Sequence, residues 1–338
     1  MKRSLLIALC VIAGCKDPVD QAAKKRIFSA EDPPQAVAAA SQKLPPEEAA
    51  ENFGISRRIL EMGAAETTER IGPHTYTAQI SWEWSQNGRN VRLKEARELL
   101  SGPGGVSGDF IARMSNTNDQ GIEVLRVGGK VFARSTYGRD GAGKFRQRLR
   151  DRGMAERVRE EASGALRDFD QLFNGRLKLA AQGTSTLEGR TAWKYVVSLG
   201  EPGKGLDEKL PPIQKPRSGN VDATTALRQK FYESREPRSL TGEVYVDADT
   251  SVVIKSRLDG RIGVKGDEGD AELHLVIESN LTGIGRAPAI EAPKEFLPDE
   301  DKPDGIAAAL TRFGIERKTA DGGVPATGGN SEPVDDAE

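Results

Sequence analysis

A lysine and two glycines in this chain have the spacing of a phosphate-binding loop. In the stretch GRDGAGKF, residues 138–145, Gly138, Gly143 and Lys144 fit the pattern G-x-x-x-x-G-K, in which backbone amides and the lysine hold phosphates. The pattern continues with a serine or threonine that binds Mg²⁺, and Phe145 stands at that position. The flanking segments also favour antiparallel hairpins over a parallel strand and helix. We therefore interpret the stretch as a turn and expect no nucleotide cofactor.

The chain offers little for acid–base or metal chemistry. Its two histidines, His74 and His274, lie in no H-E-x-x-H motif, and the chain has no G-x-S-x-G motif. We expect both histidines to be solvated surface residues. The acidic stretch PDEDKPDG, residues 298–305, matches a calcium loop poorly because a proline occupies a ligand position. We predict that the protein is not an enzyme and has no metal site and no cofactor.

The N-terminus carries a more specific motif. A basic start, MKR, precedes an apolar run over residues 4–14 that is too short to span a bilayer as a mature helix. The run ends in Ile12-Ala13-Gly14-Cys15, which resembles the lipobox of bacterial lipoproteins. The resemblance implies that residues 1–14 are a signal peptide and that Cys15 carries acyl chains such as palmitate. An ordinary secretory signal with an unrelated cysteine is the alternative.

Acylation of Cys15 would determine where the protein resides. Each buried CH₂ group of an acyl chain contributes about 0.8 kcal/mol, so two or more chains hold a protein stably at a membrane. The resemblance thus implies a lipid anchor in the bacterial cell envelope, and Lys16 in place of aspartate favours the outer membrane, facing the periplasm. Cys10 leaves with the signal, so no disulfide is expected. A formal net charge of −2 with interspersed signs argues against a nucleic-acid partner.

Composition divides the rest of the chain into a domain and two terminal segments. Residues 15–45 mix charge, alanine and proline, which predicts a flexible tether with one short helix near residues 35–42. Residues 46–314 form the predicted domain, and the loop rich in proline, glycine and lysine at residues 200–219 is predicted to be an insertion in it. Residues 315–338, rich in glycine, proline and acid, are predicted to be a disordered tail.

Alternation of apolar and polar residues predicts most of the secondary structure. In HTYTAQISWEW, residues 74–84, every second side chain from Tyr76 to Trp84 is apolar or aromatic, and His74 lies on the same side. One face of the strand is therefore dry and the other wet. Comparable strands are predicted at residues 74–85, 90–99, 106–116, 121–127, 130–137, 177–187, 190–199, 252–264 and 271–281. Short turns at Asn87-Gly88, Gly128-Gly129 and Glu188-Gly189 require antiparallel neighbours.

Amphipathic helices are predicted at residues 46–62, 151–174 and about 221–233. The dry faces of the strands outnumber these helices. The predicted fold is therefore α+β and mainly antiparallel β, a strongly curved half-barrel sheet of about ten strands with two or three helices across its concave face. Such a sheet either closes on a filled core or encloses an apolar ligand.

This order of elements resembles the lipoprotein-carrier group of envelope proteins, of the LolA, LolB, LprG and LppX type, over roughly residues 46–300. The resemblance implies an acyl-chain ligand between the sheet and the helices. It carries over no binding residue, and the loop at residues 200–219 departs from the group.

The dry faces themselves supply six candidates to line a lipid pocket: Tyr76, Ile80, Trp82, Trp84, Trp193 and Tyr195. The same residues fit an ordinary packed core. The domain would then be a non-catalytic interaction module for an envelope protein partner. A cavity under the helices would favour carrying, and close packing would favour interaction.

Overall fold

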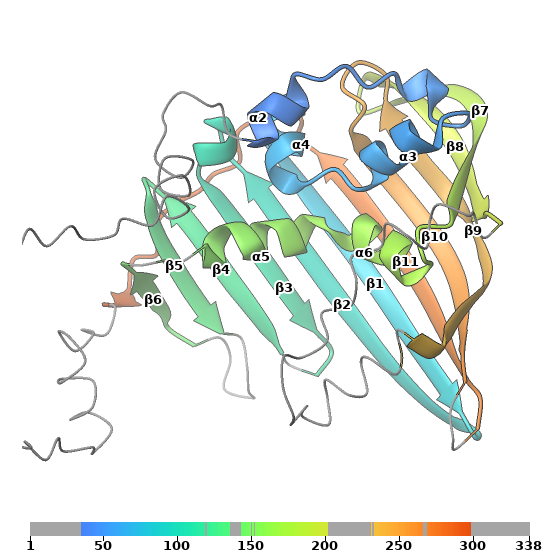
Figure 1. Cartoon of the computed structure of the whole chain (residues 1–338). Coiled ribbons are helices and arrows are strands. Elements are labelled where there is room, and N and C mark those ends of the chain that lie inside the picture. The colour runs from blue at the N-terminus through green and yellow to red at the C-terminus, as the bar shows by residue number, and fades with distance from the viewer. Residues whose placement is uncertain are drawn as a thin grey trace, which may run out of the picture. The chain divides into compact units, whose positions relative to one another are not determined.

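The computed structural model describes residues 35–118, 120–135, 143–149, 151, 153–201, 231, 233–265 and 269–298. They contain one sheet of twelve strands, whose curvature is visible in Figure 1. In chain order the strands are β1 His74–Gln86, β2 Arg89–Ser101, β3 Phe110–Asn116, β4 Gly121–Val127, β5 Lys130–Ser135, β6 Phe145–Arg148, β7 Leu177–Leu187, β8 Arg190–Leu199, β9 Arg235–Asp247, β10 Val253–Val264, β11 Ala271–Thr282 and β12 Phe296–Leu297.

The order of strands across the sheet is β12-β6-β5-β4-β3-β2-β1-β11-β10-β9-β8-β7. Neighbours pair antiparallel except β12, which pairs parallel with β6. The predicted fold class is confirmed: the described chain is a mainly antiparallel, open half-barrel with helices on one face. The nine predicted strands are present, and β6, β9 and β12 are additional.

The predicted hairpin turns have the backbone that two-residue connections need. Asn87 and Gly88 have φ angles of 50° and 73°, and Glu188 and Gly189 have φ angles of 51° and 76°. Positive φ at both central residues matches the turn to the right-handed twist of the two strands. These turns therefore fix the β1–β2 and β7–β8 registers.

The helices are shorter and more numerous than the sequence pattern indicated. They are α2 Gln35–Ala40, the 3₁₀ turn η1 Pro46–Glu48, α3 Phe53–Leu60, α4 Ala64–Ile71, the 3₁₀ turn η2 Gly105–Ser107, α5 Met154–Ser163 and α6 Ala165–Leu172. Figure 1 shows α5 and α6 crossing one face of the sheet in succession, while α2, α3 and α4 lie toward one end of the strands.

The prediction of one helix at residues 46–62 is wrong. The Asn52 side chain accepts hydrogen bonds from the amides of Gly54 and Ile55, at 3.0 and 3.3 Å, so α3 begins anew at this cap. A break at Gly164 likewise divides the predicted helix at 151–174 into α5 and α6. Most of the helix predicted at 221–233 lies outside the described residues.

The last part of the segment predicted as a tether contacts the domain. Arg70 Nη2 of α4 donates to the carbonyl oxygens of Ala39 and Gln42, at 2.9 and 3.1 Å. The Ser251 hydroxyl donates to the Leu44 carbonyl. The chain is therefore held against the domain from about α2 onward.

Side chains are buried on both faces of the sheet. The main core lies on the face crossed by α5 and α6, which we call the inner face, and includes Phe110, Ala112 and Val124. A smaller cluster, Ile111, Leu125 and Phe132, alternates with these residues along β3, β4 and β5 and so lies on the outer face. Residues 283–298, the C-terminal strap, contribute Ile290 and Phe296 to it.

Candidate functional site

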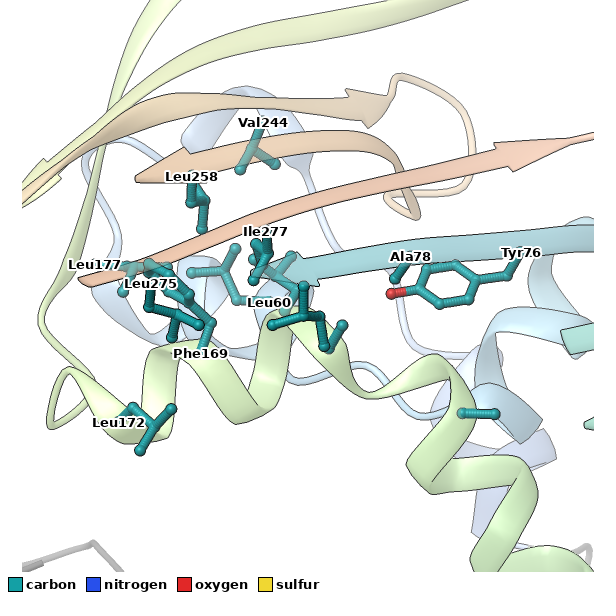
Figure 2. Close-up of a cluster of buried hydrophobic side chains, with 14 of the residues drawn as sticks. Leu60, Tyr76, Ala78, Phe169, Leu172, Leu177, Val244, Leu258, Leu275 and Ile277 are labelled. Carbon is teal, nitrogen blue, oxygen red and sulfur yellow. The ribbon is translucent and has the colours of Figure 1, made fainter. Parts of the chain in front are cut away.

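The inner face is filled with side chains where α5 and α6 cover it. Phe169 of α6 and Phe173 just after it stack with ring centroids 4.6 Å apart. Gly260 of β10 lies under Phe173, where a Cβ atom would come within 2.2 Å of the ring. Figure 2 shows Phe169 pointing from the helix toward Leu275 of β11. Close packing therefore occupies this part of the half-barrel, as it does in ordinary protein cores.

A hollow of about 210 Å³ lies beside this packed region, between α6 and strands β1, β2 and β11. We call it the α6 hollow. Its apolar wall consists of Ile80, Trp82, Ala165, Phe169, Leu172, Leu275 and Ile277. Its polar wall consists of Arg97, Asp168 and Gln171. Apolar walls with a few polar groups are typical of sites that bind small molecules.

Arg97 of β2 connects the sheet to both helices at this hollow. Its Nη1 atom donates to Asp168 Oδ2 of α6 at 2.7 Å and to the Glu161 carbonyl of α5 at 2.8 Å, and its Nε donates to Glu95 Oε1 at 2.5 Å. The side chain is 10% exposed. Burial opposes the charge on Arg97, but Glu95 and Asp168 outweigh it and raise the pKa of the guanidinium. Arg97 therefore remains charged and holds α6 at the rim of the hollow.

A second hollow of about 350 Å³ lies on the other side of this ion pair, over β2 to β5. Met114 and Ile122 supply its apolar wall, and Glu95, Asn116 and Ser135 are among its polar residues. Arg97 lines the α6 hollow and Glu95 lines this one, so their ion pair stands between the two.

Beyond the helices, the inner face of β1 and β2 remains apolar and partly exposed. Trp82 lies opposite Leu93 and Trp84 lies opposite Val91, and Val91 is 63% exposed. The Trp84 ring centroid is 6.4 Å from that of Phe231. The Trp82 Nε1 atom is buried and has no hydrogen-bond partner among the described residues. The apolar surface of the α6 hollow therefore continues along these strands.

The prediction that His74 is a solvated residue is wrong, because His74 is 1% exposed. It lines a small hollow of about 50 Å³ between α3, α4 and the inner face. Its Nδ1 atom is 2.9 Å from the Gly72 carbonyl, which can only accept, so Nδ1 carries the proton. Burial lowers the pKa of His74 to about 4, with Arg159 adding to the effect and the Gly72 carbonyl opposing it. His274, by contrast, is a surface residue that bonds Asp259 at 2.9 Å.

Asp170 of α6 is a second buried ionisable group. Burial raises the pKa of its carboxyl group to about 6, although Arg57 at 3.6 Å and the Leu177 amide favour the charged form. Asp170 lines neither the α6 hollow nor the small hollow at His74. We therefore assign it a structural role at the junction of α6 and β7.

The six predicted lining residues do not gather at one site. Ile80 and Trp82 line the α6 hollow, and Trp84 lies farther along the same face of β1. Tyr76 lines the small hollow near His74. Tyr195 is fully buried, with its hydroxyl donating to the Pro46 carbonyl, and Trp193 packs against the main core. Sequence reasoning missed Arg97, whose place on the dry face of β2 was its only signal.

Several sequence motifs lie wholly or largely outside the described residues. They are Cys15 with its lipobox, residues 138–142 of the phosphate-loop-like stretch, residues 202–219 of the predicted insertion, and residues 299–305 of the acidic stretch. Within the described residues, acidic side chains, histidines and cysteines form no group that could hold a metal ion. Each helix found among them is too short or too polar to span a bilayer.

Comparison with known proteins gives distant structural similarity. No protein-family model matches the chain, and no curated protein matches it. Similar solved structures include MucB, with 16% identity and a TM-score of 0.27 over 73% of this chain and 63% of the MucB chain. They also include LprF from Mycobacterium bovis, with 11% identity and a TM-score of 0.23 over 74% of this chain and 99% of LprF. The lipoprotein LppX from Mycobacterium tuberculosis has 10% identity and a TM-score of 0.25, over 68% and 98% of the two chains. At these values no residue role passes from them to this chain.

Proposed function

We propose that this protein binds a hydrophobic ligand of the acyl-chain class on the inner face of its sheet, without catalysing a reaction. The observation that carries the proposal is the α6 hollow, whose seven apolar wall residues lead onto the partly exposed surface at Trp84 and Val91. Each CH₂ group that this surface removes from water contributes about 0.8 kcal/mol to binding.

The size of the α6 hollow limits what it can enclose. Pockets for drug-sized molecules measure roughly 300–1,000 Å³, and the α6 hollow measures about 210 Å³. It therefore takes one segment of an acyl chain, with the remainder of the chain lying along the exposed surface at Trp84 and Val91. The small hollow at His74, of about 50 Å³, is too small for such a segment.

The proposal includes a membrane anchor. The lipobox-like residues at 12–15 support acylation of Cys15 and a place in the bacterial cell envelope, with the outer membrane favoured by Lys16. A lipid anchor would keep a carrier of acyl chains beside the membrane that supplies them. Mass spectrometry of the N-terminal peptide from membranes should find Cys15 as the first residue with acyl mass attached, and an unmodified cysteine would contradict the anchor.

Tryptophan fluorescence gives a direct test of ligand binding. The chain has three tryptophans, Trp82, Trp84 and Trp193, and each contributes to the inner side of the sheet. A brominated fatty acid should quench their fluorescence in a saturable, stoichiometric manner, and lipid extracts of protein from membranes should contain bound lipid. Absence of both quenching and bound lipid would exclude the proposal.

A pair of matched substitutions locates the ligand. Gln171→Phe places a ring in the α6 hollow from its polar wall, whereas Gln79→Phe places the same ring on the exposed outer face of β1. We expect Gln171→Phe to weaken binding of the brominated fatty acid about tenfold, which corresponds to about 1.4 kcal/mol. Gln79→Phe should leave binding unchanged, and equal effects of the two would place the ligand elsewhere.

The packed region under α5 and α6 favours a second candidate function, a non-catalytic interaction module for an envelope protein. In that case protein from membranes should contain no bound lipid. Cross-linking in intact cells should then join the domain to a single protein. The cross-link should be lost in the Gln171→Phe variant if the interface is at the α6 hollow, and in the Gln79→Phe variant if the interface is on the outer face of β1.

A further inference from the structure

The two ends of the sheet are finished differently. At one end β12 pairs with β6, and its Phe296 ring lies 5.0 Å from that of Phe132. At the other end, β7 has eleven residues and pairs only with β8 among the described residues, as Figure 1 shows. Proteins usually protect an edge strand with charges, prolines or bulges. β7 has one charged residue, Lys178, and its register shift falls after Ala181, so Lys178 is the one protective feature of the segment from Leu177 to Ala181.

The direction of the backbone groups on this edge can be determined from two hydrogen bonds. The Gly200 amide donates to the Arg176 carbonyl across the β7–β8 pair, whereas the Leu177 amide donates away from β8, to Asp170 Oδ1. Backbone groups alternate between the two sides of a strand. Leu179 and Ala181 therefore direct their amides and carbonyls outward, and no described backbone group pairs with them.

A groove lies against the inner side of the same edge. It has a volume of about 250 Å³ and is bounded by α3, the turn before it and the start of β7. Ala49, Ala50 and Phe53 form one apolar wall, and Leu177 and Leu179 form the other. The remaining lining residues are Glu51, Ser56, Arg176, Lys178, Gly200 and Glu201. Phe53 is 48% exposed. An added strand beside β7 would place every second side chain in this groove.

We propose that the first half of β7 is a docking site for an extended segment of another protein, which adds to the sheet as a further antiparallel strand. The occupant is specified by the edge and the groove together. Outward backbone groups at Leu179 and Ala181 require a partner backbone, and the groove requires apolar side chains on the partner's inner side. The exposed Lys178 points to the opposite face of β7, so acidic residues on the partner's outer side complement its charge.

The site is separate from the α6 hollow, which lies over β1, β2 and β11. It does not depend on the proposed lipid ligand. Directly paired residues of antiparallel strands point to the same face. The partner residues that hydrogen-bond Leu179 and Ala181 are therefore those whose side chains enter the groove.

Peptide chemistry provides the test. The probe is a short fluorescein-labelled peptide of alternating valine and glutamate, added to the full chain and followed by fluorescence anisotropy. N-methylation of the valines removes the donors that face β7 and should abolish binding. N-methylation of the glutamates removes donors on the far side and should leave it unchanged. Equal binding of both methylated peptides, or no binding of the parent peptide, would overturn the proposal.

Protein variants give an independent readout. Ala181→Pro removes an outward amide without removing a hydrogen bond to β8, and proline is tolerated at such edge positions. We expect Ala181→Pro to weaken peptide binding at least tenfold. Ala50→Trp, which fills the groove, should weaken it by as much, whereas Ala181→Ser should bind as the parent protein does. If Ala181→Pro fails to fold, the methylated peptides still decide. A dimer of the parent protein that Ala181→Pro dissociates would overturn the proposed partner, because a second copy would then occupy the edge.

Discussion

His74 shows how burial converts a titratable residue into a determinant of stability. Its pKa falls from 6.5 to about 4 in the folded protein. The unfolded chain therefore binds a proton at a higher pH than the folded protein does. The stability contributed by the neutral ring is complete above pH 6.5 and is lost as the pH falls through 4, a change of about 3 kcal/mol.

Comparison of the parent protein with His74→Gln should reveal this contribution. Asp170 acts in the opposite direction, since its raised pKa of about 6 adds stability as the pH falls toward 3.8. Urea unfolding between pH 7 and pH 4 gives the unfolding free energy of each protein, and the Asp170 contribution cancels in their difference. We expect the unfolding free energy of the parent protein, relative to that of the variant, to fall by about 3 kcal/mol across that range. A difference that stays constant with pH would contradict the account of His74.

The burial of His74 was implicit in the sequence. His74 is on the same side of the strand as Tyr76 and Ala78, and alternation alone places it on the dry face. The polarity of histidine argued for the surface, and here the alternation was the better predictor. Arg97 was missed because a charged residue on a dry face needs partners, and only the folded chain brings these partners close.

At the level of elements, Arg97 determines how α5 and α6 sit on the sheet. Arg97→Ala removes its bonds to Asp168, Glu95 and the Glu161 carbonyl and should cost about 1–3 kcal/mol of unfolding free energy. Hydrogen exchange of residues 161–172 should accelerate more than that of β10. Arg92→Ala is the matched control, because the Arg92 side chain is 75% exposed and bonds Glu83 on the outer face. Equal exchange in the two variants would show that Arg97 does not hold the helices.

The elements also show where sequence patterns lose their power. Strand β9 has Pro237 and Gly242, both unfavourable in strands, and it was not predicted. Pro237 lies at a register shift against β10, and Gly242 pairs with Leu258, whose side chain would be 2.7 Å from an added Cβ atom. Both residues therefore fit the neighbouring strand β10, and the local sequence of β9 gives no information about that strand. Helix α4 was not predicted, and its cap, Glu160 of α5, comes from a distant part of the chain.

At the scale of the whole molecule, local patterns predicted the hairpins but not the order of the sheet. The turn residues establish the pair β1–β2, yet β1 also pairs with β11 over twelve residue pairs from Thr75↔Thr282 to Gln86↔Ala271. Both strands have one apolar face, so many partners would satisfy them equally. The half-barrel followed from the ratio of dry strands to helices, while the open surface at Trp84 depends on where α6 ends.

The C-terminal strap provides a test of how the whole sheet is completed. It passes from β11 across the outer face to β6, where Phe296 packs on Phe132 and two residues pair with the edge. Phe296→Ala should lower the unfolding free energy by about 1 kcal/mol, because the side chain is 43% exposed and buries only part of its area. Hydrogen exchange of β6 should rise, whereas Phe296→Leu should keep most of the protection. If β6 exchanges equally in both variants and the parent protein, the strap does not close this edge, and both ends of the sheet would be open to added strands.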